Sequence, residues 1–306
     1  MSSKFFSIPS FAKINLSLRI LGKRNDGFHE LSTIFQTISL HDNLTFSEDS
    51  ELILTSDTKK IPLDERNLII KAAKLLKEKY GIKMGAKINL EKNIPAPGGL
   101  GGGSSNAAIA LLGLSKLWEI EIDFVNLLEL GELLGSDVPF FFYGGTAIGT
   151  GRGTKIFPRQ EINERNMLIV TPAVDVSTAD AFGGLNATHL TNNSSKTILQ
   201  ICRYEAELML LQQSSMKNDF EEIVFKLEPE IERVKKSLIS SGAKTALMSG
   251  SGASVLAIFE NEVRLQSALY NLKTERDWRV FPVKTVSHPI YIESLKYFDS
   301  LLQKDC

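Results

Sequence analysis

The sequence predicts an α+β protein built from two domains. Its 306 residues are more than one domain of the usual size needs and fit two domains of about 150 residues each. Each half combines segments with strand periodicity and segments with helical periodicity, and a polar connector at 159–165 separates the halves. We therefore expect one domain over residues 1–157 and a second over residues 158–306.

The composition excludes several classes of protein. The chain is 43% hydrophobic and 23% charged with a formal net charge of −1, so its charge gives no reason to expect nucleic acid as a partner. Its two cysteines, Cys202 and Cys306, form neither a disulfide framework nor a zinc site, which fits a cytoplasmic location. With no apolar run of membrane-spanning length, we expect no membrane partner.

The first half opens with strands. Residues 11–20 alternate, with apolar side chains at the even positions, so Lys13 and Asn15 share one face. A lone lysine on a strand is often only a solvated charge, and that alternative stays open at this point. Further strands are expected at 31–40, 44–46, 52–54 and 86–91, and helices at 67–80 and 124–134.

A glycine-rich loop follows the strand at 86–91. Only Leu100 interrupts its glycines, which are Gly98, Gly99, Gly101, Gly102 and Gly103. Ser104 and Ser105 follow as expected N-cap residues of an apolar helix. Bare backbone and a helix N-terminus aimed at one point favour phosphate binding. A flexible linker is the alternative, and neither the Walker pattern nor the dinucleotide fingerprint is present.

Asp137 lies in a turn directly before Phe140, Phe141 and Phe142. An aspartate in a turn is commonly only a turn former. Beside three phenylalanines, however, an ionised carboxylate needs a partner to offset its desolvation. Asp137 is therefore a candidate functional residue.

The second half begins with a strand at 167–170 and a loop at 176–182. We expect helices at about 196–212, 218–226, 229–241 and 262–273, strands on either side of a glycine turn within 245–259, a strand near 279–284, and a helical tail to residue 306.

Three blocks in this order resemble the GHMP kinase superfamily. They are Phe-Ala-Lys-Ile-Asn-Leu at 11–16, Pro-Gly-Gly-Leu-Gly-Gly-Gly-Ser-Ser-Asn-Ala-Ala at 97–108, and Ser-Gly-Ser-Gly-Ala at 249–253. The long glycine loop, Asp-Gly-Phe-His at 26–29 and Gly-Ser-Asp-Val-Pro-Phe-Phe at 135–141 resemble one member of the superfamily in particular. That member phosphorylates the 2-hydroxyl of a sugar alcohol carrying cytidine diphosphate in the non-mevalonate isoprenoid pathway. The likeness runs from about residue 8 to 285 and leaves the tail uncovered.

The resemblance implies a two-domain kinase with its active site in the cleft between domains, using ATP and Mg²⁺. Lys13 and Asp137 match its catalytic pair. Such a pair suits the chemistry, because a carboxylate can accept the hydroxyl proton while a nearby ammonium keeps it ionised. The ATP-binding positions that the resemblance implies are Pro97, Gly98, Gly99, Leu100, Gly101, Gly102, Gly103, Ser104, Ser105 and Asn67. The substrate-binding positions are Asn15, Phe28, His29, Thr178 and Phe182.

Phe28 stands where the family often has tyrosine, and stacking on a base needs only the ring face. Ser104 or Ser105 could reach the metal, but no acidic Mg²⁺ ligand stands out in the sequence. The expected partner is a small molecule with a cytidine diphosphate moiety, and the expected state is a monomer or weak homodimer. The alternatives are another GHMP kinase, of the homoserine or mevalonate type, and a non-catalytic sugar-binding regulator on the same fold.

Overall fold

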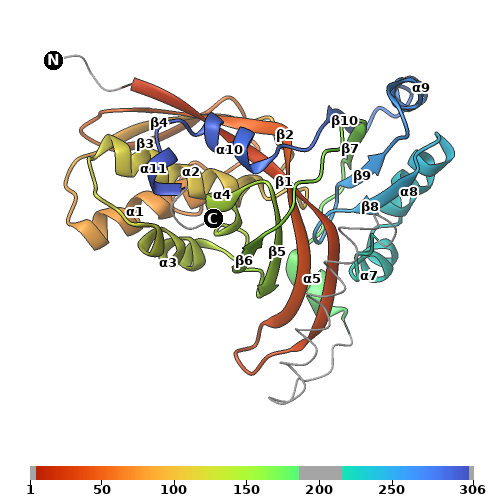
Figure 1. Cartoon of the computed structure of the whole chain (residues 1–306), viewed down its shortest axis with the longest axis horizontal. Helices are drawn as coiled ribbons and strands as arrows, with labels where there is room; N and C mark the ends of the chain where they lie inside the picture. Colours follow the sequence, from red (N-terminus) through yellow and green to blue (C-terminus); the bar gives the residue numbers. More distant parts are fainter. Residues whose placement is uncertain (1–4, 186–215, 303–306) are drawn as a thin grey trace.

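The computed structural model describes residues 5–185 and 216–302, which form two sheets with helices packed against them (Figure 1). The first sheet contains β1 (Phe5–Lys23), β2 (His29–Ser47), β3 (Leu52–Ser56), β4 (Ala86–Glu91), β5 (Thr146–Gly151) and β6 (Lys155–Pro158). The second contains β7 (Met167–Pro172), β8 (Thr245–Met248), β9 (Val255–Ile258) and β10 (Trp278–Val283) in the order β10-β7-β9-β8. The α+β prediction is confirmed.

Strand β2 organises the first sheet. It pairs antiparallel with β1 along almost its whole length, and its other edge pairs with β5 at 31–36 and with β4 at 43–47. The sequence predicted two separate strands here, which is wrong. The polar residues after Leu40 lie beside an irregularity in the β1–β2 register, where Phe11 faces His41 but Ala12 faces Ile38. A bulge thus absorbs the break in the pattern without ending the strand.

The helices that precede the second sheet are α1 (Leu68–Tyr80), α2 (Gly102–Leu117), α3 (Phe124–Leu134) and α4 (Phe140–Tyr143). Those that follow β7 are α5 (Thr178–Gly183), α7 (Glu221–Leu227), α8 (Pro229–Ser240), α9 (Glu262–Leu272), α10 (His288–Ser294) and α11 (Asp299–Leu302). The helix expected at 196–212 lies outside the described residues. Among the described helices, none combines the length and the apolar character needed to cross a membrane.

Helix α2 begins earlier than predicted. Ser104 and Ser105 were expected at the N-cap, but the helix starts at Gly102 and its N-cap is Gly101, with φ of +67°. Because glycine has no Cβ, it adopts this left-handed conformation without strain, and the helix begins three residues sooner than it would with Ser104 as its N-cap.

The second sheet packs against the first. In β7, Met167 and Ile169 join a cluster with Ala12, Ile14 and Leu16 of β1. The alternate residues Leu168 and Val170 face a separate core formed with α7, α8 and α9. Burial on both faces explains why β7 reads as an uninterrupted apolar run.

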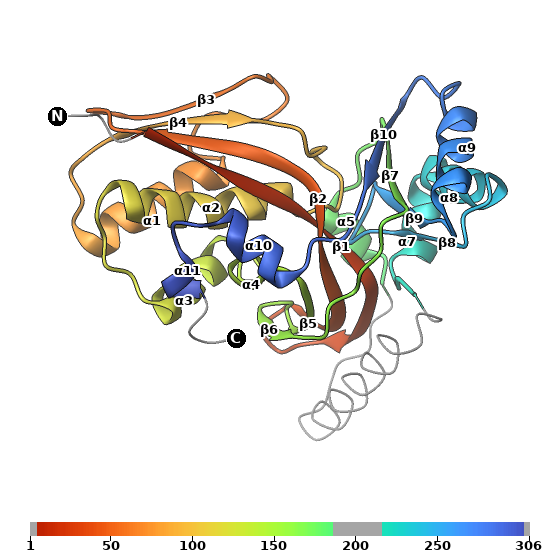
Figure 2. The ribbon, with the colours of Figure 1, turned by 45° about the horizontal axis from the view of Figure 1, so that its top comes forward.

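The C-terminal helices differ from expectation. The sequence analysis assigned them to the second domain, but α10 and α11 lie beside α2, α3 and α4 (Figure 2). Tyr291, Ile292, Leu295, Phe298 and Leu302 are buried in the core of the first sheet. The apolar side of the tail finds its partner surface there, so residues 158–306 do not form one packing unit. The expected domain boundary after residue 157 stays a prediction.

Helix α2 approaches β2 so closely that Gly113 has no room for a side chain. A Cβ built there would lie 2.4 Å from the ring of Phe46, which is fully buried. We expect Gly113→Ala to lower the free energy of unfolding by about 1–3 kcal/mol relative to Gly103→Ala, because it overpacks the core. Gly103 is the matched control. It lies in the same helix, and its added Cβ would meet no atom closer than 3.8 Å.

Denaturant titration of both variants without ligand measures this difference. Equal midpoints and slopes for the two variants would contradict the close α2–β2 contact.

Candidate active site

A cleft of about 740 Å³ lies between the two sheets. It is lined by β1, the β1–β2 hairpin, the glycine loop, the turn after α3 and the segments at 176–182 and 250–252. The predicted site residues that line it are Lys13, Asn15, Phe28, His29, Pro97, Gly99, Gly101, Ser104, Asp137, Thr178 and Phe182. Residues that are far apart in the sequence thus meet in one cavity.

Lys13 and Asp137 form an ion pair. The Lys13 Nζ lies 3.2 Å from the Asp137 Oδ2, and the lysine side chain is 4% exposed against 33% for the aspartate. The expected meeting of these two residues is confirmed. The ammonium also donates to Asn15 Oδ1 at 2.8 Å and to the Gly99 carbonyl at 3.0 Å. Its three N–H groups therefore have three acceptors, which is what a buried ammonium requires.

Asn15 is held so that its oxygen faces the lysine. Its Nδ2 donates to Thr33 Oγ1 at 2.7 Å, and the Thr33 hydroxyl donates to the Ser17 carbonyl. Thr33 also lines the cleft, although the sequence analysis did not single it out. It lies on β2 opposite Leu18, so its contact with Asn15 depends on the strand register.

Two glycines of the loop pack so closely within the protein that they leave no room for a side chain. Gly99 has φ of +69°, and a Cβ there would lie 2.1 Å from the Ser249 carbonyl oxygen. A Cβ on Gly101 would lie 2.9 Å from both Lys13 Cγ and Phe141 Cζ. Both glycines also line the cleft, and their expected contact with phosphate stays a prediction. The lack of side chains lets the loop pack directly on Lys13 and on the 249–252 segment.

The third block that resembles the superfamily, at 249–253, and Ser254 after it support this loop from the second sheet. Ser249 Oγ donates to the Gly99 carbonyl at 3.1 Å and accepts from the Asn15 backbone N–H at 3.3 Å. The Ser254 N–H donates to the Gly98 carbonyl at 3.2 Å. Both halves of the chain thus fix the position of the loop beside Lys13.

Several predicted ATP-binding residues lie outside the lining of the cleft, namely Asn67, Gly98, Leu100, Gly102, Gly103 and Ser105. Ser105 is fully buried, with its hydroxyl 2.7 Å from that of Ser10. It therefore cannot reach a metal in the cleft, in contrast to Ser104. Asn67 caps α1, accepting from the Ile69 N–H and donating to the Pro62 carbonyl. Its expected adenine contact stays a prediction.

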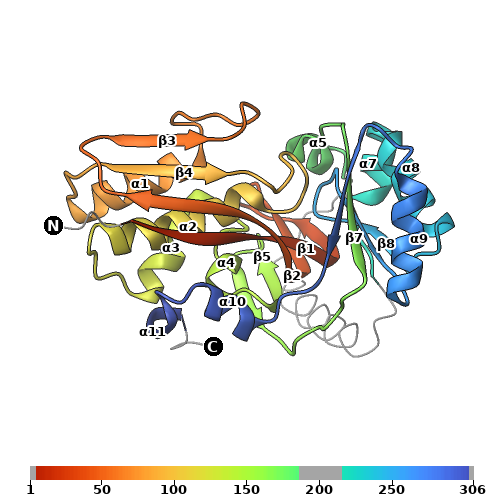
Figure 3. The same cartoon turned by 90° about the horizontal axis from the view of Figure 1, so that it is seen from above.

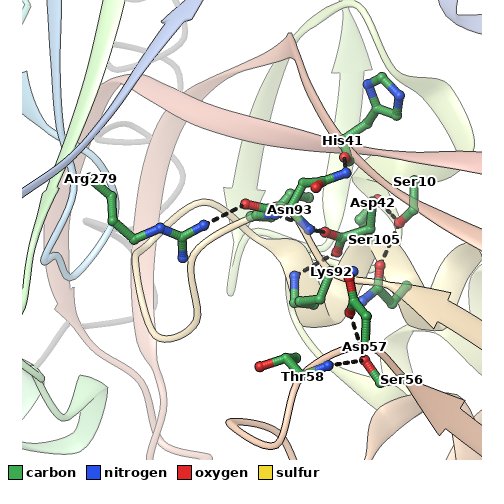
Figure 4. Close-up of polar contacts among 12 residues, drawn as sticks. Ser10, His41, Asp42, Ser56, Asp57, Thr58, Lys92, Asn93, Ser105 and Arg279 are labelled. Atoms are coloured by element: carbon green, nitrogen blue, oxygen red, sulfur yellow. Dashed lines mark hydrogen bonds and ion pairs between the residues drawn. The ribbon is translucent and has the colours of Figure 1, made fainter.

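A buried carboxylate that the sequence analysis missed fixes the entry to the glycine loop (Figure 4). Asp42 is fully buried, and its Oδ1 accepts from the N–H groups of Asn93 and Ile94 at 2.7 and 2.8 Å. Its Oδ2 accepts from Lys92 Nζ at 2.5 Å. Burial lowers the pKa of Lys92, and the charge of Asp42 opposes that shift. Arg279 of β10 donates to the Asn93 carbonyl at 3.2 Å, which ties the second sheet to the same point.

The other end of the cleft is aromatic. The rings of His29 and Phe182 stack at a centroid distance of 4.9 Å and an angle of 25°. Phe28 is 49% exposed and lies under the guanidinium of Arg152, 4.5 Å from its ring centroid. Burial, assisted by the charge of Lys23, lowers the pKa of His29. His29 is therefore neutral near pH 7, with one donor and one acceptor nitrogen.

Thr178 and Arg152 complete this end of the cleft. Thr178 Oγ1 lies 2.9 Å from Ser251 Oγ, which joins the segment before Phe182 to the 250–252 turn. Arg152 lines the cleft but was not singled out. The sequence feature that could have identified it is the glycine-rich stretch around it, Gly-Thr-Gly-Arg-Gly at 149–153.

The residues of the cleft fit a magnesium ion that arrives with a nucleotide. Across residues 5–185 and 216–302, no group of three or more His, Cys, Asp or Glu residues could hold a metal. Asp137 and the Ser104 hydroxyl nevertheless line the same cavity. Mg²⁺ commonly binds one or two carboxylates together with substrate phosphates and water, so this small donor set is sufficient.

The comparisons with known proteins agree with this geometry. The model for the GHMP kinases N terminal domain matches residues 67–145, and that for the GHMP kinases C terminal matches residues 205–276. A curated relative from Bacillus cereus (strain B4264), 4-diphosphocytidyl-2-C-methyl-D-erythritol kinase, is 40% identical over 264 residues, or 86% of this chain and 91% of the relative. The kinase of that name from Bacillus cytotoxicus is 41% identical over 265 residues, with the same coverage.

Solved structures give the same result. A crystal structure of 4-(cytidine 5'-diphospho)-2C-methyl-D-erythritol kinase superposes with a TM-score of 0.73 at 31% identity, covering 92% of this chain and 99% of that one. A homoserine kinase from Cytophaga hutchinsonii has a TM-score of 0.65 at 21% identity over 92% of this chain and 95% of its own, which shows the shared fold alone. The chain therefore belongs to the GHMP kinases and, within them, to the 4-diphosphocytidyl-2-C-methyl-D-erythritol kinase family.

Proposed function

We propose that this protein transfers the γ-phosphoryl group of ATP to the 2-hydroxyl of 4-diphosphocytidyl-2-C-methyl-D-erythritol, a step in non-mevalonate isoprenoid precursor synthesis. The observation that carries the proposal is the Lys13–Asp137 ion pair, which lies in one cleft with the glycine loop and the aromatic pocket. The relatives of that name support the choice of substrate.

Asp137 is suited to act as the general base. It is partly exposed to the cleft while its Oδ2 contacts Lys13, so it can meet a substrate hydroxyl and remain ionised. In the reaction the substrate oxygen bonds to the γ-phosphorus, the bond to the bridging oxygen of ADP breaks, and the hydroxyl proton passes to Asp137. The Lys13 ammonium stabilises the negative charge that develops on the transferred group.

The glycine loop and the first turn of α2 would position the phosphates of ATP. The free N–H groups at a helix N-terminus favour anions, and Ser104 adds a hydroxyl in the cleft. The Ser104 hydroxyl, together with the phosphates and water, would hold a magnesium ion bound to the nucleotide, which would neutralise phosphate charge. Phosphoryl transfer needs mainly such positioning and charge neutralisation.

The aromatic pocket would bind the cytosine. The neutral imidazole of His29 can donate one hydrogen bond and accept another, which matches a base edge that offers both an amino group and ring acceptors. Phe182 stacks on His29, and Phe28 presents an exposed ring at the same end of the cleft. We expect the base to stack on these rings.

A panel of acceptors tests the proposal against the alternatives. ATP consumption is measured with 4-diphosphocytidyl-2-C-methyl-D-erythritol, homoserine, mevalonate and galactose as separate substrates. Turnover with the cytidyl substrate alone is expected. Preference for homoserine or mevalonate would favour another GHMP kinase activity, and no turnover with any acceptor would favour a non-catalytic regulator.

Replacing the proposed base should slow the chemical step. We expect Asp137→Asn to lower kcat by roughly 10²–10⁴-fold with little change in substrate binding, because the shape is kept and the proton acceptor is lost. Steady-state kinetics and a binding titration measure the two effects. Asp123→Asn is the matched control, because Asp123 caps α3 on the exposed surface and asparagine caps a helix equally well. Near-normal turnover of Asp137→Asn would show that Asp137 is not the base and only forms the turn.

Removing an aromatic ring should selectively weaken binding of the cytidyl substrate. We expect Phe182→Ala or Phe28→Ala to raise its KM roughly 5- to 150-fold, since a base–aromatic stack contributes about 1–3 kcal/mol. The KM for ATP should barely change. Phe5→Ala, which removes an exposed ring outside the cleft, is the control. Loss of ATP affinity instead would mean that the nucleotide occupies the aromatic end.

A further inference from the structure

The C-terminal segment returns from the second sheet to the first and packs against α4, the helix that follows the Asp137 turn. Figure 3 shows the blue chain running from β10 to α10 and α11, which lie beside α4 and α3. Along this path Val286 binds β2: its N–H donates to the Thr37 carbonyl at 2.9 Å, and its carbonyl accepts from Gln36 Nε2 at 3.1 Å. Neither the sequence motifs nor the proposed chemistry gives this segment a role.

Two tail residues donate to carbonyls at the end of α4. This helix is a single turn, and the last carbonyls of a helix have no partner within it. The Tyr291 hydroxyl donates to the Phe141 carbonyl at 2.5 Å, and His288 Nδ1 donates to the Tyr143 carbonyl at 2.7 Å. Tyr291 is fully buried, and burial raises the pKa of its phenol, so the hydroxyl keeps the proton that it donates.

Tyr291 also packs against the backbone at the end of this helix. A Cβ on Gly144 would lie 2.2 Å from the Tyr291 ring, so the ring lies directly on the glycine. The helix that it holds begins three residues after Asp137. The connecting turn is closed by hydrogen bonds from Val138 N–H to the Gly135 carbonyl and from Phe141 N–H to the Val138 carbonyl. A shift of α4 would therefore move the Asp137 turn.

The phenylalanines of α4 transmit that position to the catalytic pair. Phe140 packs on Phe35 with a centroid distance of 4.9 Å, and Lys13 Nζ lies 5.7 Å above the Phe35 ring. The Phe141 ring lies against Gly101 of the glycine loop. Both rings are fully buried, and a close-packed core transmits displacement rather than absorbing it.

We propose that the C-terminal segment 286–298 positions Asp137 against Lys13 by holding α4, with Tyr291 as the main positioning residue and His288 as the second. Tyr291 does not touch the cleft; it acts through Phe141 and the turn before it. This inference rests on the proposed function, because it assigns Asp137 the role of base.

Tyr291→Phe tests the inference, because it keeps the ring and removes only the donated hydrogen bond. We expect kcat to fall roughly 10-fold, since a small misplacement of a catalytic group is costly, while the KM for ATP and for the cytidyl substrate stays within about twofold. Tyr297→Phe is the matched control. It makes the same chemical change in the same tail, where the contacts of Tyr297 are made by its ring with Phe6 and Lys116, and kcat should not change.

A double-mutant cycle with Asp137→Asn separates positioning from a general loss of structure. If Tyr291 acts through Asp137, adding Tyr291→Phe to Asp137→Asn should change the remaining kcat by less than about twofold. An equal fall in both backgrounds would overturn the inference, as would a normal kcat in Tyr291→Phe alone. Normal turnover in Asp137→Asn alone would instead overturn the proposed function, and this inference with it.

His288 gives an independent measurement if Tyr291→Phe folds poorly. His288→Ala should lower kcat in the same way, and His288→Asn should restore it, because the asparagine amide can donate from nearly the position of Nδ1. Equal activity in both His288 variants would contradict a role for the donated hydrogen bond.

Discussion

The structure depends on how one buried cation is accommodated. The Lys13 ammonium has left water almost completely, and such a charge is tolerated only if it is paired and hydrogen-bonded. Its three partners come from three segments, which are β1 itself, the glycine loop and the turn after α3. Each of these segments is fixed in turn by a neighbour: Asn15 by Thr33, Gly99 by Ser249, and the turn by α4. The hydrogen bonds that stabilise this one charge therefore also hold the two halves of the chain against each other.

The features of the fold and the site that follow from local sequence patterns could be predicted. Alternation along β1 was enough to place Lys13 beside Asn15, and helical periodicity with glycine at the end located α1 within one residue. The carboxylate of Asp137 among phenylalanines signalled a buried partner on physical grounds. These signals work because side-chain direction follows from the strand and helix periods.

Features set by contacts between distant residues could not be predicted. Asp42 looks like part of a polar interruption in a strand, and only the folded chain shows that it binds the backbone of Asn93 and Ile94. The glycine loop was recognised, but not its packing against the second sheet, because Ser249 lies 150 residues from Gly99. The sequence of the tail predicts helices but not the surface against which they pack. Their place beside α4 depends on the hydrogen bond from Tyr291 to the Phe141 carbonyl.

The return of the tail has a consequence for synthesis of the protein. During translation the amino-terminal part of a chain emerges and begins to fold first. Here the core of the first sheet includes Tyr291, Leu295 and Leu302, which leave the ribosome after the strands and helices that they pack against. Until these residues emerge, that core is incomplete and the carbonyls of Phe141 and Tyr143 lack the donors Tyr291 and His288. The first sheet therefore cannot complete its packing from the amino-terminal part of the chain alone.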